Sequence, residues 1–430
     1  GLYDPMEPSS WKHGDPEHPT PRQRGFDRFY GTLDGVASYF HPHTLLEDDE
    51  IIQPEGDNFY YTDTISERAA EMIEMAASTD APFFLYLSYT APHWPLHAHE
   101  EDIAKYKGRF DAGWDKLREK RIERMTNMGI IHPDWNLSDR DPDVGPWEKV
   151  ENKDWQARRM EVYAAQIDRM DQGIGRIIDT LKETGEFENT VIVFLADNGG
   201  CAEELSNGDS WIMNLLNKPP YVGTLETRDG RKVRFGNSPE IVPGGEDTYS
   251  SYGLPWANVS NTPFRLYKHW VHEGGIATPF IVHWPNGIAA HGELRHQPAQ
   301  LPDVMSTFLD IAGIDYPETL EGKSIKPVEG FSMTPTFIDQ PHQREVLYWE
   351  HEGNRAVRRG KWKLVRKNDT DWELHNMEEG RTEVNNVAAD HPEIVKELTS
   401  LYNSWAKRCN VMEFDDLRAF RQSMGKSDES

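Results

Sequence analysis

An acid and an amide directly follow an apolar run in the middle of the sequence. Residues 190–201 read T-V-I-V-F-L-A-D-N-G-G-C, which places Asp197 and Asn198 just after a Val/Ile/Leu/Phe segment. A buried parallel strand has this composition, and ligands in open α/β sheets bind past the carboxyl ends of such strands. Carboxylate and amide oxygens suit a hard cation such as Ca²⁺ or Mg²⁺. Asn-Gly after a strand is also an ordinary turn signal, so both interpretations stay open.

A histidine between two prolines is a second candidate for chemistry. Residues 82–90, P-F-F-L-Y-L-S-Y-T, have the composition of another buried strand, and A-P-H-W-P follows them. The flanking prolines stiffen the backbone around His93 and can aim its ring. Imidazole titrates near neutral pH, which suits a general acid. A structural histidine that bonds a loop carbonyl is the alternative.

A lysine in a third segment could bind an anion. Residues 264–275 read F-R-L-Y-K-H-W-V-H-E-G-G, and Lys268 offers a point charge suited to an anionic group. A solvated surface lysine is the alternative. Several other histidines have no metal-ligand spacing and are expected on the surface, namely His13, His18, His41, His43, His97 and His99.

The elements that must position these residues predict an α/β fold. Apolar periodicity predicts helices at residues 62–77, at residues 302–311 and along a stripe of residues 160–181 that ends near Gly185. Strands are predicted at residues 82–90, 190–196 and 278–285. This alternation favours a mostly parallel sheet sandwiched by helices.

The sequence predicts a change of architecture after about residue 342. Short segments separated by Gly, Asn and Asp predict a small antiparallel sheet, and residues 392–407 predict a helix that covers it. We therefore expect a main α/β domain at residues 1–341, a small C-terminal sheet and helix subdomain at 342–410, and a loose tail at 411–430.

Composition excludes several classes of protein. Asp and Glu outnumber Lys and Arg by 73 to 46, and the formal net charge of -27 repels nucleic acid and anionic lipid. We therefore expect no nucleic-acid partner. Two cysteines cannot form a disulfide framework or a thiolate zinc cluster, and no apolar run is long enough to cross a bilayer. The oligomeric state and the compartment, periplasm or cytoplasm, stay open.

Four motifs in order resemble the bacterial arylsulfatases, the sulfatase family of the alkaline-phosphatase-like superfamily. They are G-F-D-R-F-Y-G-T-L at residues 25–33, P-F-F-L-Y-L-S-Y-T-A-P-H-W-P-L-H-A at 82–98, F-L-A-D-N-G-G at 194–200 and R-L-Y-K-H-W-V-H-E-G-G at 265–275. The resemblance covers nearly the whole chain. It implies hydrolysis of sulfate esters, with a small aryl sulfate or a sulfated glycan as substrate.

The resemblance also implies roles for the candidate residues. Asp197 and Asn198 match the family's Ca²⁺ ligands, and Mg²⁺ is a possible substitute. His93 and Lys268 match the family's catalytic residues that bind the sulfate group. The cation and the two side chains together neutralise charge that develops during hydrolysis.

Three segments of the family pattern are not found in the 430 residues. Sulfatases carry a paired-aspartate metal site, a Cys/Ser-x-Pro-x-Arg segment whose first residue becomes formylglycine, and a G-K-W-H segment. Neither Cys201 nor Cys409 precedes Pro-x-Arg, so this chain offers no nucleophile. The family's order places these segments upstream of Gly1. We therefore expect an amino-terminally truncated fragment with little or no activity alone.

Two other functions stay open at this point. A phosphatase or phosphodiesterase of the same superfamily would share the scaffold but use Ser or Thr as nucleophile and commonly two metals. A non-catalytic carbohydrate-binding scaffold would use the aromatic-bearing loop at residues 211–270 as its sugar platform.

Overall fold

The computed structural model describes residues 20–32, 35–206, 225–342 and 344–423. These residues belong to two compact units. The first comprises Gly1–Arg118, Arg140–Phe187 and Cys201–Ser260, and the second comprises Glu119–Asp139, Glu188–Gly200 and Asn261–Ser430. His13, His18 and part of the predicted 211–270 sugar platform lie outside the described residues. Within the described ranges, every helix is too short or too polar to cross a bilayer.

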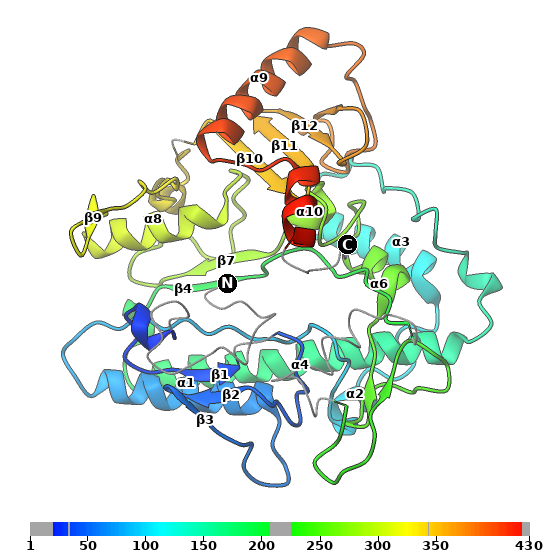
Figure 1. Cartoon of the computed structure of the whole chain (residues 1–430), viewed down its shortest axis with the longest axis vertical. Coiled ribbons are helices and arrows are strands. Elements are labelled where there is room, and N and C mark those ends of the chain that lie inside the picture. The colour runs from blue at the N-terminus through cyan, green and yellow to red at the C-terminus, as the bar shows by residue number, and fades with distance from the viewer. Residues whose placement is uncertain (1–19, 33–34, 207–224, 343, 424–430) are drawn as a thin grey trace. The chain divides into compact units, whose positions relative to one another are not determined.

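Two long helices lie side by side in the first unit (Figure 1). They are α1 (Tyr61–Ala77) and α4 (Lys153–Glu183), and both confirm helices predicted from apolar periodicity. The guanidinium of Arg169 in α4 donates to both carboxylate oxygens of Asp63 in α1, at 2.6 and 2.5 Å. Just after α4 the chain turns at Gly185, whose φ of +82° is in the left-handed region that favours glycine.

The other elements of the first unit are short. The strands β1 (Tyr30–Thr32), β2 (Leu45–Glu47) and β3 (Glu50–Ile51) form one antiparallel sheet, and β5 (Arg234–Phe235) pairs with β6 (Thr248–Tyr249) in parallel. The helices are η2 (Arg22–Arg24), α2 (Glu100–Ala104), η3 (Trp147–Lys149) and α6 (Gly253–Ser260). Helix α3 (Gly113–Asn127) contributes residues to both units.

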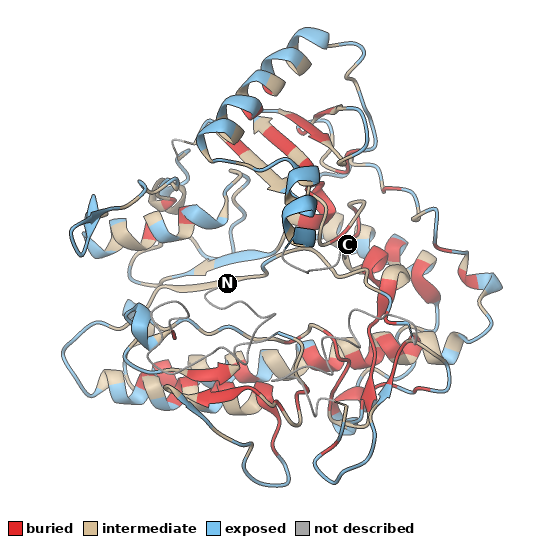
Figure 2. Ribbon diagram, in the orientation of Figure 1, coloured by how far each residue is buried: buried red, intermediate tan, exposed pale blue. Residues whose placement is uncertain are grey.

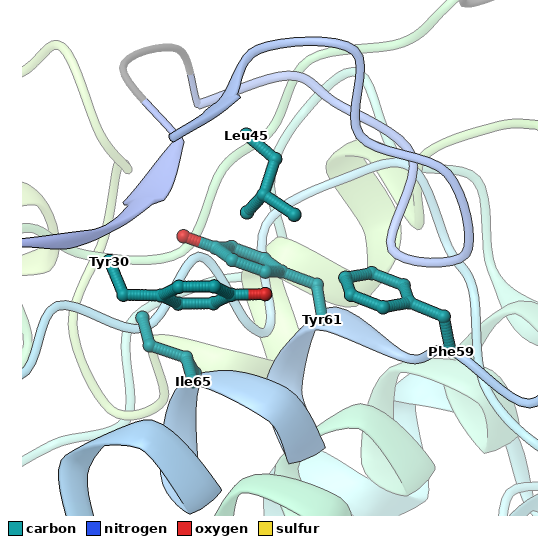
Figure 3. Close-up of a cluster of buried hydrophobic side chains, with 5 residues drawn as sticks. All are labelled: Tyr30, Leu45, Phe59, Tyr61 and Ile65. Carbon is teal, nitrogen blue, oxygen red and sulfur yellow. The ribbon is translucent and has the colours of Figure 1, made fainter. Parts of the chain in front are cut away.

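A buried aromatic cluster joins the first sheet to the start of α1 (Figure 3). Its members are Tyr30, Leu45, Phe59, Tyr61 and Ile65, each at most 9% exposed. The hydroxyl of Tyr61 also accepts the backbone N–H of Thr32 at 2.9 Å. Burial of one such side chain contributes about 1.5–3 kcal/mol, so this cluster anchors α1 to the sheet.

Residues 82–90 form no strand, which corrects the prediction of a strand there. Leu87 and Tyr89 pack against the aromatic cluster, whereas Phe84 and Tyr86 are 63% and 70% exposed. No other segment of the described chain forms a ladder with these residues. An apolar, β-branched or aromatic composition favours extended backbone, but it does not supply the neighbouring strand.

The buried state of His97 corrects the expectation that it lies on the surface. The residue is 1% exposed, and its Nε2 lies 2.6 Å from the carbonyl oxygen of Thr248. Since that carbonyl only accepts, Nε2 carries the proton and donates. Burial lowers the pKa of His97 to about 4, so the ring is neutral near pH 7 and has a structural role.

In the second unit, β4 (Ile192–Leu195) pairs with β7 (Phe280–His283). The pair is antiparallel, with Ile192 opposite His283 and Leu195 opposite Phe280. This pair is thus an antiparallel one, whereas the alternation of strands and helices predicted a sheet that is mostly parallel. Apolar runs predict where strands lie, but the connections between them set their direction.

Other short elements complete this part of the chain. They are η4 (Phe187–Asn189), α7 (Glu273–Ile276), α8 (Leu301–Ala312), β8 (Thr319–Leu320), β9 (Lys323–Ser324) and η5 (Thr334–Ile338). Helix α8 confirms the helix predicted at residues 302–311. It begins with a capping box, in which the Gln300 and Asp303 side chains bond each other's backbone N–H groups.

A four-stranded antiparallel sheet and a helix confirm the predicted C-terminal architecture. The strands β10 (Val346–His351), β11 (Asn354–Arg359), β12 (Trp362–Arg366) and β13 (Glu373–Asn376) pair in chain order. Helix α9 (Pro392–Arg408) packs on this sheet, and Figure 2 shows buried residues along β11 and β12. Helix α10 (Phe414–Ser423) occupies part of the segment expected to be a loose tail.

A buried ion network connects this sheet to α7. The Lys363 ammonium, 0% exposed, lies 2.9 Å from a Glu273 oxygen and 2.8 Å from a Glu383 oxygen. The Arg381 guanidinium donates to the other Glu273 oxygen at 2.9 Å. Burial opposes ionisation of Glu273, but Lys363 and Arg381 outweigh it and hold the pKa of that carboxyl well below its usual range.

We predict that Lys363→Met destabilises the chain by about 3–5 kcal/mol at pH 7, because it leaves buried carboxylates without their ammonium partner. Denaturant unfolding followed by circular dichroism measures this change. Lys361→Met is the matched control, since Lys361 is exposed and immediately precedes β12. The control should change the free energy of unfolding by about 0.5 kcal/mol or less.

The same pair of proteins gives a pH test. The depressed pKa of Glu273 contributes stability that is present above its unfolded value of about 4.3 and is lost as the pH falls below it. The difference in the free energy of unfolding between wild type and Lys363→Met should therefore narrow as the pH falls from about 5 to about 3, a range that brackets the unfolded pKa. A constant difference would contradict the assigned ion network.

Candidate functional site

The loop after β4 carries the two predicted metal ligands. This D-N-G-G loop, residues 197–200, has an exposed Asp197, whose Oδ1 accepts the N–H of Asn198 at 3.0 Å. The N–H of Gly199 donates to the carbonyl oxygen of Gly275 at 3.0 Å. A Cβ at Gly199 would lie 1.8 Å from the carbonyl oxygen of Gly274, so only glycine permits this approach.

The lysine loop, residues 264–275, is bonded to the D-N-G-G loop. The backbone N–H of Lys268 donates to the carbonyl oxygen of Gly200 at 3.1 Å. On either side of the lysine, Leu266 and His269 adopt φ values of 65° and 88°. Such conformations cost a residue with a side chain about 1–3 kcal/mol and are often found at functional sites. The second unit thus brings Lys268 next to the predicted metal ligands.

His93 lies in the first unit and has a defined orientation there. Its Nδ1 lies 2.8 Å from the carbonyl oxygen of Trp94, so Nδ1 carries a proton and donates. Its backbone N–H donates to Thr90, and its carbonyl accepts the Tyr39 hydroxyl at 2.9 Å. His93 thus makes the hydrogen bond to a loop carbonyl that a purely structural histidine would also make. A role for His93 beside Lys268 stays a prediction.

Asp197 and Asn198 fit a hard cation in donor type. Carboxylate and amide oxygens are the donors that Ca²⁺ and Mg²⁺ take, although Ca²⁺ requires six to eight. In the described part of the chain, Asp197 belongs to no group of three or more His, Cys, Asp or Glu with closely spaced ligand atoms. The D-N-G-G loop therefore supplies part of a coordination shell.

A different cluster contains two imidazoles and a carboxylate. His269, His351 and Glu352 have ligand atoms that all lie within 4.8 Å of one another. In this cluster His269 Nδ1 lies 3.3 Å from Glu352, Asn354 Nδ2 lies 3.3 Å from His269 Nε2, and Arg421 donates to Glu352 at 2.8 Å. These bonds partner His269 and Glu352 without a cation, so the geometry alone assigns no metal here.

Asn261 is a residue of this region that the sequence analysis did not identify. It follows α6 directly, is 9% exposed, and accepts the N–H of Gly200 on its side-chain oxygen at 2.8 Å. A polar residue at a helix end usually forms a cap or a turn, so its sequence position does not distinguish it. Only the folded chain reveals its long-range partner.

The two cysteines are structurally ordinary. Cys201 packs against the buried cluster of Trp94, Leu205, Phe235 and Tyr249, and Cys409 follows α9. Both side chains are partly buried. Nothing in their surroundings changes the prediction that neither is the nucleophile.

Sequence profiles of two families match the chain. The profile named Sulfatase matches residues 7–314, and the profile for the C-terminal region of N-sulphoglucosamine sulphohydrolase matches residues 264–407. The first match covers more than half of the chain and includes His93, Asp197, Asn198 and Lys268.

Individual sulfatases are similar over most of the chain. An uncharacterized sulfatase of Schizosaccharomyces pombe is 29% identical over 97% of this chain and 76% of its own length. The arylsulfatase of Klebsiella aerogenes is 32% identical over 77% of this chain and 70% of its own length. Among solved structures, Ps i-CgsB has a TM-score of 0.57 and 22% identity, over 91% of this chain and 68% of the other. The chain therefore belongs to the sulfatase family, sulfuric ester hydrolases with an alkaline-phosphatase-like α/β fold.

Proposed function

We propose that this sulfatase is of the arylsulfatase type and that the D-N-G-G loop and Lys268 contribute its Ca²⁺ and sulfate site. The observation that carries the proposal is the hydrogen bond from the Lys268 N–H to the Gly200 carbonyl. It holds the backbone of a cationic residue against the loop that carries two hard oxygen ligands. The identity of 32% with the Klebsiella aerogenes arylsulfatase supports this type.

In this proposal each side chain has a distinct task. The Lys268 ammonium binds sulfate oxygens and neutralises negative charge that develops on them. Because His93 Nδ1 donates to the Trp94 carbonyl, Nε2 is the ring nitrogen left to act as the acid, and in the imidazolium form it delivers its proton to the leaving oxygen. Asp197 and Asn198 hold the cation, which when bound polarises the sulfate group as a Lewis acid.

The substrate in this proposal is a small aryl sulfate or a sulfated glycan. An N-acetylglucosamine-6-O-sulfatase of Bacteroides thetaiotaomicron is 24% identical over 90% of this chain. Ps i-CgsB has also been solved in complex with k-i-k-neocarrahexaose. Equal binding of a glycan with and without its sulfate group would favour a non-catalytic carbohydrate-binding scaffold.

Formylglycine is the proposed nucleophile, and it is not supplied by these residues. We predict that the 430-residue chain alone hydrolyses 4-nitrophenyl sulfate at a rate indistinguishable from buffer, because no Cys/Ser-x-Pro-x-Arg segment is present. Release of nitrophenolate with Ca²⁺ measures this rate. A Ca²⁺-dependent rate that copurifies with the chain and is lost in Lys268→Ala would contradict the prediction.

The metal ligands can be tested without turnover. We predict that Asp197→Asn weakens Ca²⁺ binding at least about tenfold, because affinity depends on the number of charged ligands. Isothermal titration calorimetry measures the dissociation constant. Asp134→Asn is the control, since the Asp134 side chain is 83% exposed and lies outside the D-N-G-G loop. Equal loss in both variants would argue for a general charge effect.

The sulfate ligand can be tested in the same way. We predict that Lys268→Ala weakens sulfate binding about 10- to 100-fold in the presence of Ca²⁺, since hydrogen bonds to charged groups contribute roughly 1.5–3 kcal/mol. Lys323→Ala, in the exposed strand β9, should bind sulfate as the wild type does. Unchanged sulfate binding in Lys268→Ala would remove the lysine from the site.

A further inference from the structure

One buried side chain bonds three segments of the proposed site. The Oδ1 atom of Asn261 accepts the N–H of Gly200 at 2.8 Å. Its Nδ2 atom donates both protons, to the carbonyl oxygens of Leu266 and Gly274, each at 2.8 Å. All of the amide's donors and one acceptor are thereby used inside the second unit.

These three partners lie close to the residues that the proposed function uses. Gly200 ends the D-N-G-G loop, and Leu266 is two residues before Lys268. Gly274 is the residue whose carbonyl approaches Gly199. Because Asn261 contacts all three segments at once, a shift of its side chain moves the metal ligands and the lysine relative to each other.

The chemistry at this position selects an asparagine amide. An aspartate would keep the acceptor for the Gly200 N–H but would place a carboxylate against two carbonyl oxygens. An alanine would leave one N–H and two carbonyls without this partner at a position where the native residue is 9% exposed. The bond to Leu266 also holds the carbonyl of a residue with a strained φ of 65°.

We propose that Asn261 is a positioning residue, which sets the separation between the Ca²⁺ ligands of the D-N-G-G loop and the sulfate-binding Lys268. It acts through these residues and does not itself touch substrate. The inference rests on the proposed function, because it assumes that the two loops bind a cation and sulfate.

The test compares Asn261→Ala and Asn261→Asp with the wild-type 430-residue chain. Both variants should stay folded, as followed by circular dichroism, and should bind Ca²⁺ and sulfate about 10- to 100-fold more weakly, as is typical when a residue that orients ligands is removed. In the double variant Asn261→Asp/Lys268→Ala, the loss of sulfate affinity should be smaller than the product of the two single losses.

Asn237→Ala is the matched control. The Asn237 side chain also makes three hydrogen bonds. It accepts the N–H of Ser251 and donates to the Ser251 hydroxyl and to the Glu204 carboxylate, and all of these residues lie in the first unit. This control should lower the midpoint of thermal unfolding but leave both dissociation constants within about twofold of wild type, since none of the Asn237 side-chain partners belongs to either loop.

The outcomes separate this inference from the proposed function. Wild-type chain that binds neither Ca²⁺ nor sulfate overturns both. Two results overturn only the positioning role. In the first, folded Asn261 variants bind Ca²⁺ and sulfate as tightly as the wild type does. In the second, the loss of sulfate affinity in the double variant equals the product of the two single losses. Loss of folding in both single variants also overturns it, because Asn261 would then act on stability alone.

Discussion

The arrangement of the candidate site depends on close contact between two loops, which a side chain at Gly199 would prevent. A Cβ there would lie 1.8 Å from the Gly274 carbonyl oxygen, so the D-N-G-G loop could not reach the lysine loop. With glycine, the Gly199 N–H bonds Gly275 and the Lys268 N–H bonds Gly200. The loop that begins with two hard oxygen ligands is therefore held against a cationic residue.

A second constraint fixes the far end of the lysine loop. Glu273 begins α7, and the buried Lys363 ammonium of β12 and the Arg381 guanidinium bind its carboxylate. The backbone N–H of Glu273 also donates to a buried oxygen of Glu383 at 2.8 Å. A buried pair of this kind does little for net stability, but it disfavours other placements of the loop. The small C-terminal sheet thus supports the segment that carries Lys268.

Much of the fold could be predicted from the sequence, whereas the long-range contacts between its segments could not. Helices such as α1, α4 and α9 follow from local apolar periodicity, and the strand before Asp197 follows from its composition. The antiparallel pairing of β4 with β7 depends on distant connections, so composition alone does not predict the direction of this pair. The burial of His97 and the bond between Asn261 and Gly200 likewise arise from contacts between segments far apart in the chain.

The measurement that tests the account most directly is the sulfate affinity of the 430-residue chain with Ca²⁺ and after chelation of Ca²⁺ by EGTA. If Ca²⁺ and sulfate bind adjacent loops, each changes the affinity of the chain for the other, and the two changes are equal. The account predicts that Ca²⁺ tightens sulfate binding by about fivefold or more, the lower end of typical coupling between sites. Equal sulfate affinities in the two conditions, with Ca²⁺ shown to bind, would contradict a shared site.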